Sequence, residues 1–203
     1  MNGPQVIRLG GQILGVGSAS GVRLVVGRWL RTPLGPFADV MAERADGHRI
    51  LLAPTEEVRD LIARTYVFDE TRVEPVVVSV EGDEWLLESP SLWARFTIGG
   101  RLPLGWLLKT VPGPLATNPF WVSALDPVAS RVLPGVHTHG TAREGREEYY
   151  GATDLHAVTE LCGSLDDEAL GPLAPVDPAC RFGFSSPPRT PALTDIVTTL
   201  VID

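Results

Sequence analysis

Three of the four histidines of this 203-residue chain lie within residues 135–158, GVHTHGTAREGREEYYGATDLHAV. The same segment contains two arginines, four acidic residues and two adjacent tyrosines. No other part of the chain gathers as many side chains that can titrate, bind a metal or hold an anion. We therefore expect the chemistry of the protein to lie in or beside this segment.

The first half of the segment has the spacing of a metal site. His137 and His139 are two positions apart, so on a strand both imidazoles point to one side. Glu144 follows across the next turn and completes a three-ligand set with open positions for substrate. The pattern His-x-His, Glu144 and then Gly151 resembles the first motif of the cupin family. That resemblance implies a divalent metal, held by these three side chains and by His156 as the one downstream histidine. The alternative is a glycine-punctuated surface loop with two exposed histidines.

The second half of the segment supports a different chemistry without a metal. A strand over residues 147–161 would align five polar side chains on one face: Glu148, Tyr150, Asp154, His156 and Glu160. Facing a barrel interior, Asp154 would orient His156 as a general base, and Tyr150 would donate a proton. A short helix capped by Thr153 is the open alternative, and it would scatter these side chains.

Two arginines in the segment predict an anion site. Arg143 and Arg146 stand beside the histidines in an otherwise acidic chain, and a guanidinium holds a carboxylate through its bidentate fork. A small anionic ligand is therefore one candidate for the site.

Lys109 is the single lysine of the chain, against 16 arginines, and its neighbours in GWLLKTVP are apolar. Desolvation lowers a lysine pKa toward the range of Schiff-base chemistry, as in acetoacetate decarboxylase-like barrels. Leu108 stands where that family has a second lysine. A lysine that extends its ammonium from an amphipathic surface is the alternative.

The elements that must position these residues are mainly strands. Asp46-Gly47 and Glu81-Gly82-Asp83 predict two hairpins, joining 37–44 to 48–53 and 73–80 to 84–88. Residues 92–98 and the C-terminal residues 192–202 alternate as strands do. The glycine-rich N-terminus leads into a strand rather than a helix, which excludes a dinucleotide-binding loop and indicates a bulged β-segment.

Short helices interrupt the strands. Thr55 caps a helix whose apolar face is Val58, Leu61 and Ile62. Asn118-Pro119 and Asp126-Pro127 each predict the start of a further short helix. The expected architecture is therefore mainly β, a barrel or strongly curled antiparallel sheet with a few short α-helices, in a single domain over residues 1–203.

Composition limits the functions that are open. The chain has 25 acidic against 17 basic residues and a net charge of −8, which excludes a nucleic-acid surface. No apolar stretch approaches the length of a membrane span, and the first 21 residues have neither the basic region nor the unbroken apolar region of a signal peptide, so we expect a cytoplasmic protein.

The whole chain resembles conserved proteins of high-GC actinobacteria through GRWLRTPLGPFADVMAER, GREEYYGATDLH and RFGFSSPPR. This resemblance implies no particular activity. Three hypotheses follow from the residues. The first is a β-barrel that binds a small organic ligand near residues 137–156, with an anionic molecule as one candidate. The second is the cupin-like metal enzyme, and the third is a non-catalytic interaction or structural protein.

Overall fold

The computed structural model describes residues 5–132, 135–141 and 146–202. Its strands form one sheet, with bounds as follows: β1 (Gln5–Ser18), β2 (Arg23–Arg31), β3 (Phe37–Glu43), β4 (Arg49–Ala53), β5 (Glu70–Val73), β6 (Val77–Glu81), β7 (Glu84–Glu88), β8 (Leu92–Arg101), β9 (His139–Thr141), β10 (Glu147–Leu165), β11 (Glu168–Ala169), β12 (Leu173–Ala174) and β13 (Ala192–Ile202). The helices are α1 (Glu56–Ala63), α2 (Pro103–Lys109), α3 (Gly113–Ala116) and α4 (Pro119–Val132). The expectation of a mainly β protein with short helices is confirmed.

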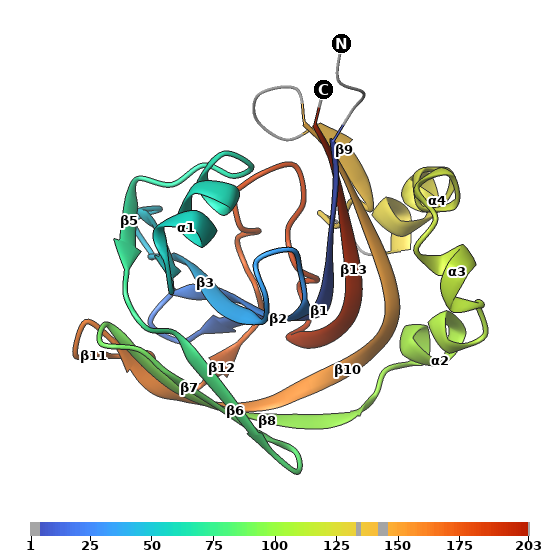
Figure 1. Cartoon of the computed structure of the whole chain (residues 1–203). Helices are drawn as coiled ribbons and strands as arrows, with labels where there is room; N and C mark the ends of the chain where they lie inside the picture. Colours follow the sequence, from blue (N-terminus) through green and yellow to red (C-terminus); the bar gives the residue numbers. More distant parts are fainter. Residues whose placement is uncertain (1–4, 133–134, 142–145, 203) are drawn as a thin grey trace.

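The sheet is strongly curled, as Figure 1 shows. Its strand order is β5-β4-β3-β2-β1-β13-β10-β8-β7-β6, and every pairing is antiparallel except that of β4 with β5. The curl brings β7 and β8 over β2, β3 and β4, so that Trp85, Leu87 and Phe96 share a core with Val40 and Ile50. This main core fills the closed half of the sheet.

The opposite face of the central strands is covered by α1 and by the loop after β12. Leu51, Val58 and Ile62 form the contact under α1, while Val25, Cys180 and Phe182 form the contact under the loop. Figure 1 shows both covers on the same side of β1, β2 and β3, facing the bent β10 and β13. The space between these walls holds the candidate site.

Strand β10 runs for 19 residues and borders both the main core and the space that holds the candidate site. Its first half pairs with β13 and its second half with β8. The register shifts between Ala152 and Asp154, where Thr153 has no opposite partner, and again beyond His156. A bulge bends a strand and moves the following side chains to the other face. The strand alternative for residues 147–161 is therefore right, but this strand does not present one continuous face.

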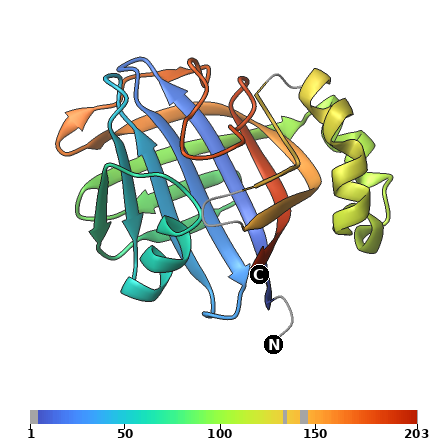
Figure 2. The ribbon, with the colours of Figure 1, turned by 90° about the horizontal axis from the view of Figure 1, so that it is seen from above.

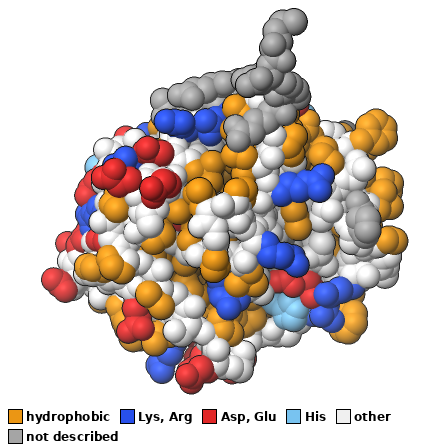
Figure 3. Space-filling model, in the orientation of Figure 1, with side chains coloured by type: hydrophobic (Ala, Val, Ile, Leu, Met, Phe, Trp, Pro, Cys, Tyr) orange, Lys and Arg blue, Asp and Glu red, His pale blue; other side chains and the backbone are white. Residues whose placement is uncertain are grey.

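The helices divide into two groups. Thr55 caps α1 as expected, accepting a hydrogen bond from Val58 N at 3.3 Å. Helices α2, α3 and α4 stand together beside β10 (Figure 2). Hydrophobic side chains protrude at this edge (Figure 3), and Trp106 and Phe120 are exposed. No helix within the described residues is long and apolar enough to cross a lipid bilayer.

Some expected elements differ in the structure. The two helices expected at Asn118 and Asp126 are one helix, α4, with Pro127 inside it. The Asp126 carboxylate instead accepts a hydrogen bond from Thr138 N at 2.6 Å, so it holds a neighbouring segment rather than capping a helix. The strand expected at 73–80 is divided into β5 and β6, because Pro75 lies between them and supplies no backbone N–H.

Other expectations hold. Gly47 and Gly82, with φ values of 90° and 62°, form the two hairpin turns. The glycine-rich N-terminus is strand β1, with a register shift between Gly10 and Gly11.

Candidate functional site: an apolar pocket with a buried carboxyl group

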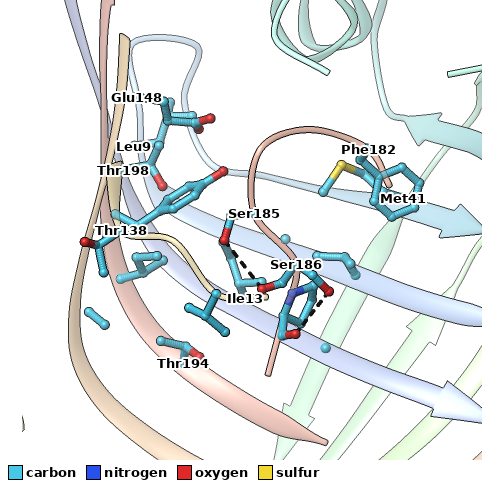
Figure 4. A pocket seen from close by; sticks show the side chains of 18 of the residues that line it. Leu9, Ile13, Met41, Thr138, Glu148, Phe182, Ser185, Ser186, Thr194 and Thr198 are labelled. Carbon is cyan, nitrogen blue, oxygen red and sulfur yellow. Dashed lines mark hydrogen bonds between the residues drawn. The ribbon is translucent and has the colours of Figure 1, made fainter. Parts of the chain in front are cut away.

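A cavity of about 170 Å³ lies between the central strands and their covers. Its walls come from β1, β2, β3, β10 and β13, and its covers are α1 with the residues after it, α2, residues 136–138 and the loop at 182–188. Figure 4 shows the pocket with Leu9, Thr198 and Thr138 on one side and Met41 and Phe182 on the other. An apolar cavity of about 150 Å³ is large enough to hold benzene, so this one has the size of a small organic molecule.

The pocket surface is mainly apolar. Leu9, Ile13, Ile196 and Leu200 represent the aliphatic side chains that form most of it. Threonine and serine hydroxyl groups supply scattered polar points, and Ser185 and Ser186 lie on the loop that crosses the pocket (Figure 4). A surface of this kind binds the apolar body of a ligand and leaves orientation to a few polar groups.

The loop fits closely against the sheet because a glycine faces it. A Cβ at Gly15 would overlap the ring of Pro187, so a side chain there would push the loop away. Glu43 holds the same loop from the other end. Its carboxylate accepts from Arg181 N at 2.8 Å and Arg181 Nε at 2.9 Å, and it pairs with buried Arg23 at 2.9 Å. The buried Glu43 carboxylate thus holds the cover to the sheet through the backbone N–H and the exposed guanidinium of Arg181.

Glu148 is the most unusual side chain in the pocket. It lies on β10, it is 1% exposed, and Figure 4 shows its carboxyl group extending away from the strand. The Tyr66 hydroxyl donates a hydrogen bond to Glu148 Oε1 at 2.6 Å. Among the described residues, Glu148 Oε2 has no hydrogen-bond partner although it is buried. Burial raises the pKa of Glu148 to about 7, and the hydrogen bond from Tyr66 opposes that rise.

Two tyrosines complete this cluster. The hydroxyl oxygens of Tyr66 and Tyr150 are 2.6 Å apart, and the Tyr150 ring stacks on Phe184 with ring centroids 5.4 Å apart. Since the Tyr66 proton goes to Glu148, Tyr150 donates to Tyr66. Desolvation, followed by the nearby Glu148 carboxyl, raises the pKa of both phenols well above 10. Both phenols therefore stay protonated as hydrogen-bond donors.

A second buried acid lines the same pocket. Asp39 on β3 accepts a hydrogen bond from Trp29 Nε1 at 2.7 Å, and burial raises its pKa to about 7. Gly27 makes room for this bond, because a Cβ there would overlap both partner atoms. Within the described lining there is no lysine or arginine, and His137 is the one basic side chain.

Tyr150, Asp154 and His156 do not come together as predicted. Glu148, Tyr150 and Ala152 face the pocket, but the bulge after Ala152 turns the next residues so that Leu155 faces it instead. Asp154 and His156 are not among its lining residues. The prediction of a single face was wrong because it assumed unbroken alternation along β10.

Asp154 belongs instead to a charged cluster on the opposite face. Arg101 donates to both of its oxygens at 2.7 and 2.9 Å, which holds the pKa of Asp154 well below its usual range. Lys109 Nζ lies 3.2 Å and His156 Nε2 3.5 Å from Asp154 Oδ2. Lys109 is half-exposed and paired here, so it does not have the desolvated setting that Schiff-base chemistry requires.

The cupin-like metal site is not supported. His137 lines the pocket with its Nδ1 3.4 Å from Asp126, whereas the His139 ring stacks on Tyr149 at 4.5 Å. In the part of the chain that the structure describes, no three His, Cys, Asp or Glu side chains are grouped to hold a metal ion. The third expected ligand, Glu144, lies outside the described residues.

Of the two predicted arginines, one is among the described residues. Arg146 is buried and does not line the pocket, and Arg143 lies outside the described residues. Sequence reasoning missed Tyr66 and Asp39 altogether. Asp39 carried one signal, an acidic residue between the apolar residues of a strand predicted at 37–44, but Tyr66 sits after a helix with no pattern to mark it.

Comparisons with known proteins concern the fold alone. No protein-family model matches the chain, and no curated protein matches it. An acetoacetate decarboxylase structure from Legionella pneumophila subsp. pneumophila str. Philadelphia 1 is similar over 100% of this chain and 87% of that chain, with 10% identity and a TM-score of 0.44. A second acetoacetate decarboxylase structure covers 100% of this chain and 88% of its own, with 11% identity and a TM-score of 0.39. Similarity at this level assigns no activity to the chain.

Proposed function

We propose that this protein binds a small, mainly apolar organic molecule in the pocket between β1, β10, β13 and the loop at 182–188. The observation that carries the proposal is the pocket itself, a cavity of about 170 Å³ with aliphatic walls and one buried carboxyl oxygen that has no partner among the described residues. Buried polar groups are normally satisfied, so an unsatisfied one in a cavity indicates a ligand group.

The proposal retains the first sequence hypothesis and changes its details. The segment at 137–156 supplies one wall of the pocket through His137, Glu148, Tyr150 and Ala152. The ligand therefore lies beside this segment, but it contacts the side that faces the interior. The suggestion of an anionic ligand finds no support in the described lining, which contains two buried acids.

A variant that fills the cavity tests the proposal. Ala152→Leu places extra methyl groups in the pocket, while Ala157→Leu makes the same change on the same strand at a half-buried position outside the pocket. Binding of cyclohexylmethanol, a neutral molecule of suitable size, would be measured by isothermal titration calorimetry. We expect saturable binding to the wild type and to Ala157→Leu, and at least tenfold weaker binding to Ala152→Leu.

Thermal unfolding of each variant shows that it is folded before binding is compared. Native mass spectrometry of the purified wild type adds an independent measurement of any bound small molecule. Equal binding by both variants, or no binding of cyclohexylmethanol by folded wild-type protein, would contradict the proposed function.

A further inference from the structure

The buried carboxyl group of Glu148 indicates which kind of molecule the pocket takes, an inference that rests on the proposed function. One carboxyl oxygen, Oε1, accepts from Tyr66, and the other, Oε2, is buried without a partner among the described residues. An ionised carboxylate accepts several hydrogen bonds, and burying it without a counter-charge is costly. The pocket therefore contains an acceptor that the described side chains leave incomplete.

The charged groups of the pocket are mainly acidic, and His137, the one basic side chain in the described lining, lies with its Nδ1 3.4 Å from Asp126. The groups that face Glu148 are the phenols of Tyr66, which follows α1, and Tyr150 on β10. Both are neutral donors. Asp39 adds a second buried acid to the same pocket, and the whole chain carries a net charge of −8. Such a field attracts cations and opposes the entry of carboxylates and phosphates.

The shape of the pocket limits the ligand further. Aliphatic side chains and the aromatic rings of Trp29, Tyr66 and Tyr150 line the same pocket as the Glu148 carboxyl group. Aromatic faces are favourable partners for an ammonium group as well as for apolar surface. A hydrated inorganic cation would leave most of this apolar surface unused, whereas an organic cation would use both features.

We propose that the pocket binds a small apolar primary amine, with the ammonium group donating a charge-assisted hydrogen bond to Glu148 Oε2. The hydrocarbon body of the amine lies against the aliphatic side chains of β1 and β13, such as Ile13 and Leu200. Tyr66 supports the interaction by donating to the other carboxyl oxygen. Charge-assisted bonds of this type are about twice as strong as neutral ones.

In a competing arrangement, Glu148 is the hydrogen-bond donor to the ligand instead of the acceptor. A protonated Glu148 would donate from Oε2 to the oxygen of a neutral alcohol or ketone. The two arrangements differ in their dependence on pH. Because the pKa of Glu148 is raised to about 7, amine binding strengthens as pH rises through 7, whereas binding of a neutral acceptor weakens. The amine itself stays protonated over this range, as a lysine side chain does.

Three probes of the same size and a single substitution separate these cases. Cyclohexylmethylamine, cyclohexylmethanol and cyclohexanecarboxylate carry the same ring with a positive, neutral or negative head. Affinities would be measured by calorimetry at pH 6 and pH 8 for the wild type and Glu148→Gln. The amide keeps the size of the side chain but cannot ionise, and Glu147→Gln, at the exposed neighbouring position, is the matched control.

For the wild type at pH 8 we expect the amine to bind at least tenfold more tightly than the alcohol, and the carboxylate to bind least. Glu148→Gln should lose at least tenfold in amine affinity and change alcohol affinity by less than threefold, while Glu147→Gln changes neither. Amine binding that is no tighter than alcohol binding, or that weakens from pH 6 to pH 8, would overturn the inference while leaving the pocket as a binding site. Failure of both the alcohol and the amine to bind would instead overturn the proposed function.

Discussion

The hydroxyl group of Tyr66 donates a hydrogen bond to Glu148 Oε1 at 2.6 Å, across 82 residues of sequence. This bond joins the segment after α1 to the first half of β10 and so connects a cover of the pocket to its wall. It also favours the ionised form of a carboxyl group that burial would otherwise keep neutral. The Tyr66–Glu148 hydrogen bond therefore both holds a cover of the pocket against its wall and favours the negative charge on Glu148.

Tyr66→Phe removes this donor and keeps the ring. We expect the pKa of Glu148 to rise above its wild-type value, because the ionised Glu148 side chain loses the hydrogen bond from Tyr66. Loss of the bond should also lower the free energy of unfolding by about 1 kcal/mol. A ¹³C NMR titration of the Glu148 carboxyl carbon measures the pKa directly, with Tyr149→Phe, on the opposite face of β10, as the control. An unchanged Glu148 pKa in Tyr66→Phe would contradict this role.

Stability should depend on pH through Glu148. Its pKa is raised from 4.5 to about 7, so the folded protein keeps a proton that the unfolded chain releases. This stabilisation is complete below pH 4.5 and is lost as pH rises through 7, a difference of about 3 kcal/mol. Asp39, also raised to about 7, acts in the same window.

Glu148→Gln should therefore flatten part of this dependence and be more stable than the wild type at pH 8. Urea denaturation at pH 5 and pH 8 measures the two free energies of unfolding. An equal loss of stability between these pH values in the wild type and the variant would show that Glu148 is not the group responsible.

Gly27→Ala should disrupt the second buried acid. The added methyl group would overlap Asp39 Oδ1 and Trp29 Nε1, which form a 2.7 Å hydrogen bond. We expect a loss of about 1–3 kcal/mol in stability from overpacking and the strained bond. Trp29 fluorescence and thermal unfolding report the change. Gly100→Ala is the control because a Cβ there meets nothing within 4 Å. Equal stability of the two variants would refute the steric argument.

Glu43 should matter for the stability of the loop that covers the pocket. The Glu43 side chain is fully buried, with Arg23 and Arg181 as partners. Glu43→Ala leaves the buried Arg23 charge without its carboxylate, and such losses cost about 3–5 kcal/mol. Glu168→Ala removes an exposed acid whose nearest ion-pair distance is 3.7 Å, and it should cost less than 1 kcal/mol. Urea denaturation measures the free energy of unfolding of both variants. Similar losses of stability in Glu43→Ala and Glu168→Ala would contradict the role assigned to Glu43.

His156 should be independent of the pocket. Its ring lies in the charged cluster around Asp154, on the opposite face of β10. His156→Ala should change cyclohexylmethanol and cyclohexylmethylamine affinity by less than twofold. A tenfold loss for either molecule would restore the predicted role of His156 in the site.

The fold was predictable from local patterns. Turn glycines at positions 47 and 82 require positive φ, and apolar alternation at 92–98 marks a strand, so both are encoded within a few residues. The parallel pairing of β4 with β5 was not predictable in this way. It depends on the path of α1 across the sheet rather than on any short pattern.

The site was only half predictable. Glu148 and Tyr150 were identified because they lie in a segment dense in polar side chains. The bulge at Thr153 has no clear sequence signal, and it moved Asp154 and His156 to the other face. Tyr66 and Asp39 reach the pocket only through long-range packing, which a single sequence does not reveal.

The most direct measurement is a crystal structure of the wild type grown with cyclohexylmethylamine at pH 8. We predict electron density for the ring between β1, β13 and the loop at 182–188, with the amine nitrogen within hydrogen-bond distance of Glu148 Oε2. A pocket without ligand in crystals of protein saturated with the amine, or a nitrogen that points away from Glu148, would contradict the account.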